Sequence, residues 1–335
     1  MIVTKTPFRM SFFGGGTDMK EYFEENGGAV LSTTIDKYCY VNTRYLPPFF
    51  DYSTELSYSK IERVKKRDDI EHPAIRNAMK MLDIDNIRLT YEADLPARSG
   101  LGTSSSFAAG MLLAFCAMKG YHVSKKTLAT MAIDLERTLC KEAGGWQDQI
   151  AAVYGGLNKI TFDKNGFEVI PIKITEERKM LLSKNLLLFF TGFTRFSSDI
   201  QKQNNTVLTD DKKAVLKKMH EMVDEAEKIL TDEQRNLDEF GLLLNESWNL
   251  KKRTGSKIST NTIDELYRRG IEAGALGGKL LGAGGGGFLL FYVKDDQKDN
   301  VLHAMKDLLY VPFSFSNVGS DIIYPLDGCK NIIGE

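Results

Sequence analysis

The segment PARSGLGTSSS, residues 96–106, places two glycines directly before a row of hydroxyl side chains. Because glycine has no Cβ, the backbone at these positions can approach a bound anion closely. The small and apolar residues from Ser105 to Lys119 predict a helix, whose first N–H groups would point at the same anion. The segment therefore predicts a polyphosphate-binding loop, although it lacks the GxxxxGK(S/T) pattern of a P-loop. The alternative is a plain Ser/Gly-rich helix N-cap.

Two further glycine-rich segments flank this loop in the chain. FRMSFFGGGTD, residues 8–18, ends in three glycines, a threonine and Asp18. Three successive glycines predict backbone that bends sharply or touches a ligand, and a carboxylate beside them can bind sugar hydroxyls. GGKLLGAGGGG, residues 277–287, leads into an apolar strand and indicates another close backbone contact. A hairpin turn and a flexible loop are the respective alternatives.

The segment 134–156, between the central and C-terminal glycine-rich segments, gathers Glu136, Glu142 and Asp148 around a Gly-Gly break. A carboxylate near a phosphate-binding loop can hold a metal ion or orient an attacking hydroxyl group. The combination favours phosphoryl transfer, which depends on alignment and charge neutralisation more than on covalent chemistry. For each single acid, a solvated surface position is the alternative.

A mixture of strands and helices is needed to position these segments. Alternating apolar and polar residues over 87–92 predict a half-buried strand that runs into the central loop at Pro96. Since single cores stop growing at roughly 250–300 residues, two lobes are expected, residues 1–180 and 181–335. Further strands are predicted at 28–45, 157–162, 167–174, 186–191 and 288–293, and further helices after the N-cap Ser124 and at 211–230, 237–252 and 261–276.

The composition argues against several classes of function. Lys plus Arg (44) nearly balance Asp plus Glu (45), so no overall field attracts nucleic acid or an anionic membrane. No apolar run approaches the roughly 20 residues that span a bilayer, and the N-terminus lacks the features of a signal peptide. The four cysteines and four histidines are scattered, which argues against a zinc site and predicts reduced thiols in a cytoplasmic protein. A homodimer is the expected oligomeric state.

In this order, the three glycine-rich segments resemble the motifs of the GHMP kinases, named for galactokinase, homoserine kinase, mevalonate kinase and phosphomevalonate kinase. The family shows P-x-(K/R) followed by glycines, then P-x-x-x-G-L-(G/S)-S-S, then K-x-x-G-(A/S)-G-x-G-G. These motifs correspond here to residues 7–18, 96–105 and 279–287, and the resemblance spans about residues 3–293. It implies a two-lobed α+β fold, with ATP in a cleft between an N-terminal mixed α/β lobe and a C-terminal α+β lobe.

The resemblance also implies roles for individual residues. Asp148 matches the aspartate that accepts or orients the proton of the substrate hydroxyl, and Arg9 matches a Lys/Arg that neutralises charge near the reacting groups. Ser104, with Ser105 as a close alternative, and Glu136 match ligands of Mg²⁺, although Glu136 lies one residue further from the catalytic aspartate than the family spacing. The residues implied to hold the ATP phosphates are Pro96, Ser99, Gly100, Leu101, Gly102, Thr103, Ser104, Ser105 and Ser106. The residues implied to bind the substrate are Gly14, Gly15, Gly16, Thr17, Asp18, Arg195, Gly284, Gly285 and Gly286.

Departures from the family pattern bear on the acceptor. Phe8 replaces the glycine common before the Lys/Arg, and Gly15 and Gly16 replace the Glu-His pair of galactokinase and mevalonate kinase. These changes argue against galactose and mevalonate as substrates. The strings GGGTD, GWQDQ and TGFTRFSSDI are instead most similar to family members that phosphorylate the anomeric hydroxyl of sugars.

The implied substrate is a sugar phosphate such as D-glycero-D-manno-heptose 7-phosphate. A substrate that already carries a phosphate needs a basic clamp. Arg195, in the string TGFTRFSSDI, is the leading candidate, with Arg98 and Arg44 behind it.

Other functions are weighed against this one. A kinase of an unphosphorylated sugar such as fucose would need no basic clamp. A non-catalytic regulator that binds sugar and ATP would be expected to lose the catalytic aspartate or the phosphate loop, and both are present. The GGGTD and GWQDQ strings disfavour a decarboxylase of phosphorylated mevalonate. A dinucleotide-binding oxidoreductase is disfavoured because no GxGxxG follows the first strand of a βαβ unit.

Overall fold

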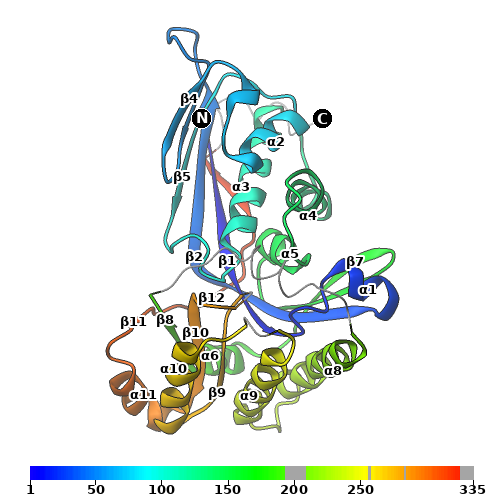
Figure 1. Ribbon diagram of the computed structural model, residues 1–335, viewed down its shortest axis with the longest axis vertical. Helices are drawn as coiled ribbons and strands as arrows, with labels where there is room; N and C mark the ends of the chain where they lie inside the picture. The colour runs from blue at the N-terminus through cyan, green and yellow to red at the C-terminus, as the bar shows by residue number, and fades with distance from the viewer. Residues whose placement is uncertain (193–208, 256–257, 283, 325–335) are drawn as a thin grey trace.

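The computed structural model describes residues 1–192, 209–255, 258–282 and 284–324. Two sheets, each with its own helices, are stacked along the long axis of the molecule (Figure 1). Residues up to about 171 and the last strands build one part, and most of the second half of the chain builds the other. Both parts combine helices and strands, so the predicted α+β fold is confirmed.

The larger sheet is organised around two long antiparallel strands, β1 (Ile2–Phe13) and β2 (Gly28–Tyr45). Its order is β13-β1-β2-β5-β3-β4, and β6 and β12 also pair with β2. At 18 residues β2 is long enough to pair with β5 near its C-terminal end and with β6 near its N-terminal end. The other strands of this sheet are β3 (Thr54–Ser57), β4 (Ile61–Val64), β5 (Ile87–Ala93), β6 (Asn158–Asp163), β7 (Gly166–Pro171), β12 (Phe315–Ser316) and β13 (Asp321–Tyr324).

The helix after the central glycine-rich loop, α3 (Thr103–Met118), is buried against β1 and β2. Small and apolar residues cover all of its sides, as expected of an interior helix. Gly110 allows a close approach to β1, where the Thr4 hydroxyl donates to the Gly110 carbonyl at 2.9 Å. This packing fixes the position of the α3 N-terminus. The other helical segments of this part are α1 (Lys20–Asn26), η1 (Arg67–Asp69), α2 (Pro73–Met81), α4 (Lys125–Ile133), η2 (Asp134–Leu139) and α5 (Gln147–Tyr154).

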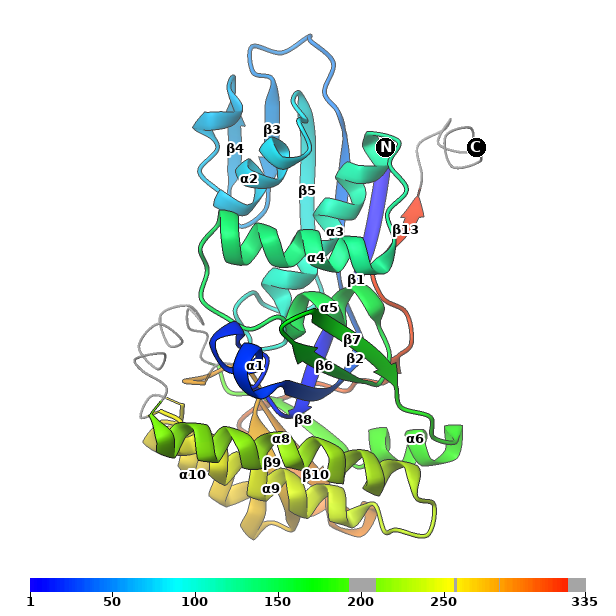
Figure 2. The ribbon, with the colours of Figure 1, turned by 90° about the vertical axis from the view of Figure 1, so that its right-hand side faces the viewer.

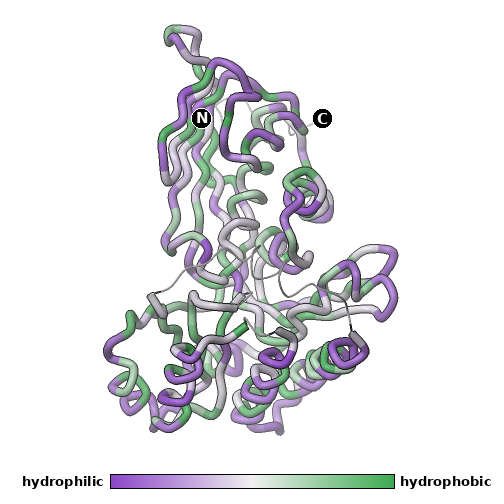
Figure 3. The backbone as a smooth tube through the Cα atoms, in the orientation of Figure 1, coloured by the Kyte–Doolittle hydropathy of each residue, from purple (hydrophilic) through white to green (hydrophobic). Residues whose placement is uncertain are grey.

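The smaller sheet is antiparallel, with the order β11-β8-β10-β9. Helices α8 and α9 lie side by side below the larger part (Figure 2), and α8 alternates hydrophilic and hydrophobic stretches along its length (Figure 3). Among the described residues, no helix combines the length and apolar character needed to cross a bilayer. The elements of this part are α6 (Glu176–Lys184), β8 (Leu186–Phe190), α8 (Asp210–Thr231), α9 (Asp238–Lys252), α10 (Asn261–Glu272), β9 (Ala275–Leu280), β10 (Phe288–Val293), η3 (Asp295–Gln297), α11 (Lys298–Ala304) and β11 (Leu309–Tyr310).

The two parts share a continuous hydrophobic core. The rings of Phe12 and Phe13, at the end of β1, lie edge-on to Phe240 of α9, with centroids 5.3 and 5.1 Å apart. Such aromatic contacts add about 0.5–1.5 kcal/mol each to the burial of the rings. The lobe boundary predicted near residue 180 falls within α6, and it stays a prediction. The later strands β12 and β13 return to the larger sheet, where they pair with β2 and β1.

A tight turn at residues 14–17 ends β1 and leads towards α1. Gly14 has a left-handed backbone (φ 79°), and a Cβ at this position would lie 1.9 Å from the Ala29 carbonyl oxygen. The Thr17 hydroxyl fixes the turn from within, at 2.9 Å from the Gly14 carbonyl oxygen and 2.8 Å from that of Ala29. The geometry of the turn therefore accounts for the glycine at position 14 and the threonine at position 17.

We expect Gly14→Ala to lower the free energy of unfolding by about 2 kcal/mol or more, because it adds both steric overlap and left-handed strain. Gly15→Ala is the matched control, since the nearest atom to its added Cβ, the Ser11 Oγ, is 3.7 Å away. Urea denaturation of the two variants measures the difference. Equal stability of both variants would contradict this reading of the turn.

Candidate active site

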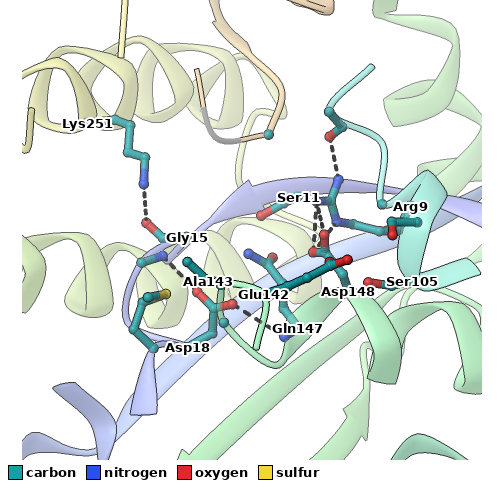
Figure 4. Close-up of a pocket in the computed structure, with 18 of the residues that line it drawn as sticks. Arg9, Ser11, Gly15, Asp18, Ser105, Glu142, Ala143, Gln147, Asp148 and Lys251 are labelled. Carbon is teal, nitrogen blue, oxygen red and sulfur yellow. Dashed lines mark hydrogen bonds and ion pairs between the residues drawn. The ribbon is translucent and has the colours of Figure 1, made fainter. Parts of the chain in front are cut away.

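The two parts of the molecule enclose a cavity of about 260 Å³, here called the central pocket (Figure 4). One side is lined by β1 with the turn after it, by the loop before α3 with the first turn of α3, and by residues 136–148. The other side is lined by residues of α8, α9 and β9. All three glycine-rich segments, and the acidic segment between the last two, therefore meet at one place.

The loop before α3 has a backbone suited to an anion. Arg98 (φ 61°), Gly100 (φ 86°) and Gly102 (φ 71°) all adopt the left-handed conformation. Gly102 is the N-cap residue of α3 and has no side chain to cap the helix. The first N–H groups of α3 can therefore bind an anion in the central pocket. The left-handed Arg98 is a strained position of the kind found at ligand-binding turns.

Arg9 and Asp148, which both line the pocket, form a bidentate ion pair (Figure 4). The Arg9 Nε and Nη2 donate to the two carboxylate oxygens of Asp148, each at 2.8 Å. The third guanidinium nitrogen, Nη1, donates to the Gly100 carbonyl at 2.7 Å. Planar guanidinium–carboxylate pairing fixes both position and orientation. Asp148 nevertheless stays 26% exposed and lies in the first turn of α5, so its carboxylate remains accessible from the pocket.

Glu136 lies beside the first turn of α3 and is only 2% exposed. Its carboxylate accepts a hydrogen bond from the Ser105 hydroxyl at 2.6 Å and another from the Gln149 side chain. Ser104, the serine matched to the metal ligand, faces outward into the pocket, whereas Ser105 contacts Glu136 directly.

The spacing between Glu136 and Asp148, one residue longer than in the family motif, coincides with a local irregularity of the helix that carries Glu136. Glu136 belongs to η2, a π-helical turn in which the Cys140 N–H donates to the Leu135 carbonyl at 2.9 Å. A π-turn contains one more residue than an α-turn. Despite the longer spacing, Glu136 reaches Ser105.

Oxygen ligands suitable for Mg²⁺ gather at this end of the pocket. Glu136 and Glu142 are close enough that the Glu136 charge, after burial, raises the pKa of Glu142. A divalent cation would offset this repulsion, and Mg²⁺ commonly uses only one or two carboxylates together with substrate phosphates. The described residues hold no cluster of three or more acidic, histidine or cysteine ligands. The residues present thus fit a cation shared with a polyphosphate.

Asp18 lies at the opposite end of the pocket and is 3% exposed. It accepts hydrogen bonds from the Gly16 N–H at 2.8 Å and the Gln147 N–H at 3.3 Å. Burial raises the pKa of its carboxyl group, opposed mainly by the Gly16 hydrogen bond. Asp18 therefore ties the first glycine turn to α5 and presents little surface to a ligand.

The third glycine-rich segment packs against the phosphate loop. A Cβ on Gly282 would lie 2.5 Å from the Gly100 Cα, and one on Gly287 would lie 2.3 Å from the Ser99 carbonyl oxygen. The close backbone contact predicted for this segment is therefore found, and it is with protein. Only Gly282 of the run 282–287, among its described residues, lines the central pocket.

Some of the predicted site residues line the central pocket, and others do not. Some hold the loops in place: the Ser106 hydroxyl, for example, donates to the Pro7 carbonyl at 2.9 Å. Arg195 lies outside the described residues. The predicted residues that line the pocket are Arg9, Gly15, Gly16, Asp18, Gly100, Gly102, Thr103, Ser104, Ser105, Glu136 and Asp148. Those that do not line it are Gly14, Thr17, Pro96, Ser99, Leu101, Ser106, Gly284, Gly285 and Gly286.

Three lysines that are not among the predicted site residues also line the pocket: Lys212 of α8, Lys251 of α9 and Lys279 of β9. Lys279 is 7% exposed, and burial first, then the nearby charges of Lys251 and Arg9, lower its pKa to about 7. Lys279 opens the third motif, which is a signal visible in the sequence. Lys251 lies within a run of three basic residues that reads as an ordinary helix end.

The sequence matches two family descriptions, GHMP kinases N terminal domain over residues 67–156 and GHMP kinases C terminal over residues 216–311. A D-glycero-alpha-D-manno-heptose 7-phosphate kinase from Campylobacter jejuni is 32% identical over 95% of this chain and 97% of its own length. A bifunctional fucokinase/GDP-fucose pyrophosphorylase from Arabidopsis thaliana is 27% identical over 87% of this chain, which covers 30% of that longer protein.

Solved structures share the fold over nearly the whole chain. A D-glycero-D-manno-heptose 1-phosphate kinase from Bacteroides thetaiotaomicron superposes with a TM-score of 0.78 at 23% identity, over 98% of this chain and 100% of the other. A galactokinase from Lactococcus lactis, solved with galactose, superposes with a TM-score of 0.74 at 18% identity, over 96% and 94% of the two chains. These likenesses show that the fold is shared.

The low pKa of Lys279 makes a prediction about stability. Between about pH 7 and about pH 10 this amine is neutral in the folded chain but protonated in the unfolded chain, so the free energy of unfolding rises with pH. The limiting slope from this group is about 1.4 kcal/mol per pH unit. Below pH 7 both states are protonated and the slope vanishes.

We therefore expect Lys279→Met to flatten the pH dependence of unfolding over this window. Urea denaturation of wild type and variant between about pH 7 and about pH 10 measures the effect. Lys173→Met, at an exposed position, serves as the control and leaves the slope unchanged. Parallel curves for wild type and Lys279→Met would mean that folding does not change the protonation of Lys279.

Proposed function

The chain belongs to the GHMP kinase family, and we propose that it transfers the γ-phosphoryl group of ATP to the anomeric hydroxyl of a sugar phosphate. The resemblance of its three motifs to this family is confirmed by a relative of 32% identity over 95% of the chain. The proposed acceptor is D-glycero-D-manno-heptose 7-phosphate, and the proposed product is the 1,7-bisphosphate.

One observation carries the proposal of phosphoryl transfer. The Arg9–Asp148 pair lies directly beside the loop before α3, because Arg9 bonds both to Asp148 and to the Gly100 carbonyl. A carboxylate able to orient a hydroxyl group thus sits next to a backbone able to hold a polyphosphate. This is the juxtaposition that in-line phosphoryl transfer requires.

The roles of the residues follow from this geometry. The acceptor hydroxyl would approach Asp148, which orients the hydroxyl and accepts its proton as the oxygen attacks the γ-phosphorus. The bond between that phosphorus and the ADP oxygen breaks on the opposite side. Arg9 and the first N–H groups of α3 would offset the negative charge of the transferring group. An anomeric hydroxyl is more acidic than other sugar hydroxyls, which suits an aspartate held by an arginine.

Mg²⁺ is the proposed metal. Glu136 with Ser104 or Ser105 would hold it, with Glu142 beside them. When bound, it would neutralise charge on the β- and γ-phosphates. A cytoplasmic location and a homodimer remain predictions.

The choice of acceptor is supported by one relative. The Campylobacter relative is named for heptose 7-phosphate and matches this chain over almost its whole length. The Bacteroides protein, whose likeness shows the fold, is named for heptose 1-phosphate. An assay must therefore identify the position that receives the phosphoryl group.

The direct test is ADP release with Mg·ATP and a panel of acceptors: heptose 7-phosphate, mannose, fucose, galactose and mevalonate. Phosphorus NMR of the product locates the new phosphate. Turnover of heptose 7-phosphate with a new anomeric phosphate signal supports the proposal. Turnover of fucose alone would replace the acceptor, and no turnover of any sugar would favour a regulator that binds without catalysis.

We expect Asp148→Asn to lower kcat by about 10²–10⁴-fold, because the amide cannot accept the hydroxyl proton. The KM for ATP should change by less than about threefold, since the phosphate loop is untouched. Asp134→Asn, an exposed acid that does not line the pocket, is the control and should keep wild-type turnover. Turnover by Asp148→Asn within tenfold of wild type would remove Asp148 from the mechanism.

A further inference from the structure

Two of the three lysines that line the central pocket, Lys251 and Lys279, each form a single side-chain hydrogen bond to the described residues. Lys251 Nζ donates to the Gly15 carbonyl at 3.0 Å, and Lys279 Nζ donates to the Phe12 carbonyl at 2.8 Å. An ammonium group has three N–H donors. Within the part of the chain that the structure describes, neither lysine forms an ion pair at 4.0 Å or less. Both therefore have donors available for a ligand.

Keeping these two lysines together without an anion is unfavourable. Burial lowers the pKa of both amines, and the charge of each neighbour adds to the effect on Lys279. The charge of Asp18 favours the protonated form of Lys251, and the charge of Lys212 opposes it. The Asp18 oxygens, however, already accept two backbone N–H groups. A dianionic ligand would supply the charge that the protein lacks here.

Unpartnered polar atoms mark the same end of the pocket. The Ser11 side chain is 5% exposed, lines the pocket, and its hydroxyl makes no hydrogen bond to any described residue. The Gln147 Oε1 is likewise buried without a partner among the described residues. Buried polar atoms of this kind normally have partners. Both side chains lie beside Gly15, whose carbonyl accepts the Lys251 hydrogen bond, and this indicates a polar ligand that both groups contact.

The position of the lysines separates them from the phosphate loop. In Figure 4, Lys251, Gly15 and Asp18 lie at one side of the pocket, and Arg9, Asp148 and Ser105 lie at the other. Lys279 lies near enough to both Lys251 and Arg9 to be affected by the two charges. The N-terminus of α3 already provides for the ATP phosphates at the Arg9 side. An anion at Lys251 would thus belong to the acceptor and not to the nucleotide.

We propose that Lys251, with Lys279 and the Ser11 hydroxyl, binds the phosphate monoester that the acceptor sugar carries before the reaction. This inference rests on the proposed function, since it assumes a phosphorylated acceptor whose reacting hydroxyl lies at Asp148. It places the basic clamp in α9 and β9, whereas Arg195, the leading candidate from the sequence, lies outside the described residues. The sugar would span the pocket, with its phosphate at Lys251 and its anomeric carbon at Asp148.

The kinetic test compares heptose 7-phosphate with unphosphorylated D-glycero-D-manno-heptose. For Lys251→Met we expect kcat/KM on the 7-phosphate to fall by about 10–100-fold, because a charge-assisted hydrogen bond is lost. On the unphosphorylated sugar, kcat/KM should change by less than about threefold, as should the KM for ATP. Equal losses on both sugars, or a raised KM for ATP, would overturn the proposal by placing Lys251 at the reacting groups.

Lys252→Met is the matched control, because Lys252 is the next residue of α9 and lies by Asp264, outside the pocket lining. It should keep the wild-type preference for the phosphorylated sugar. Loss of that preference in Lys252→Met as well would overturn the assignment to Lys251, since any loss of charge from this helix end would then suffice.

A binding measurement separates this inference from the proposed catalysis. Calorimetry with heptose 7-phosphate, in the absence of ATP, needs no turnover. Binding weakened at least tenfold in Lys251→Met, but not in Lys252→Met, supports the clamp even if the wild type transfers no phosphate, an outcome that would refute only the proposed function. Unchanged affinity in Lys251→Met would refute the clamp even if the wild type is an active kinase.

Discussion

The guanidinium group of Arg9 connects three segments that are far apart in the sequence. Its side chain holds both oxygens of Asp148 and the Gly100 carbonyl, and its backbone N–H donates to the Leu101 carbonyl at 3.0 Å. These bonds join β1, the loop before α3 and the first turn of α5. Because guanidinium is planar, it fixes the orientation as well as the position of its partners. The carboxylate and the anion-binding backbone can therefore act on the same pair of reacting groups.

Close contact between glycine loops complements this ion pair. Gly100 and Gly282 bring the two parts of the molecule so near that a Cβ on either residue would overlap the backbone of the other segment. The shared phenylalanine core beside β1 keeps the two parts in this relation. The pocket is thus bounded by rigid backbone on the phosphate side, where positions must be accurate for transfer. Long side chains such as Lys251 line the acceptor side.

Charge is distributed unevenly along the pocket. Near the phosphate loop, buried Glu136 and neighbouring Glu142 suit a cation, whereas Lys251 and Lys279 at the acceptor side suit an anion. Each group of like charges is destabilising by itself, and each is offset by binding the opposite charge. A group of like charges lowers the folding stability of the free protein and raises its affinity for a ligand of the opposite charge.

Most of the fold was predictable, because the alternation in β5, the N-cap Ser124 and the apolar stripes of α8 and α9 depend on local spacing. By itself the sequence determined the α+β class, the family and the neighbourhood of Arg9, Ser105, Glu136 and Asp148. Only the tertiary structure decided what each glycine touches, since a sequence pattern does not distinguish a ligand from another loop. It also decided that Lys251 and Lys279 line the same pocket. Two lysines 28 positions apart look like surface cations until folding brings both to the lining of one cavity, where desolvation makes their charge significant.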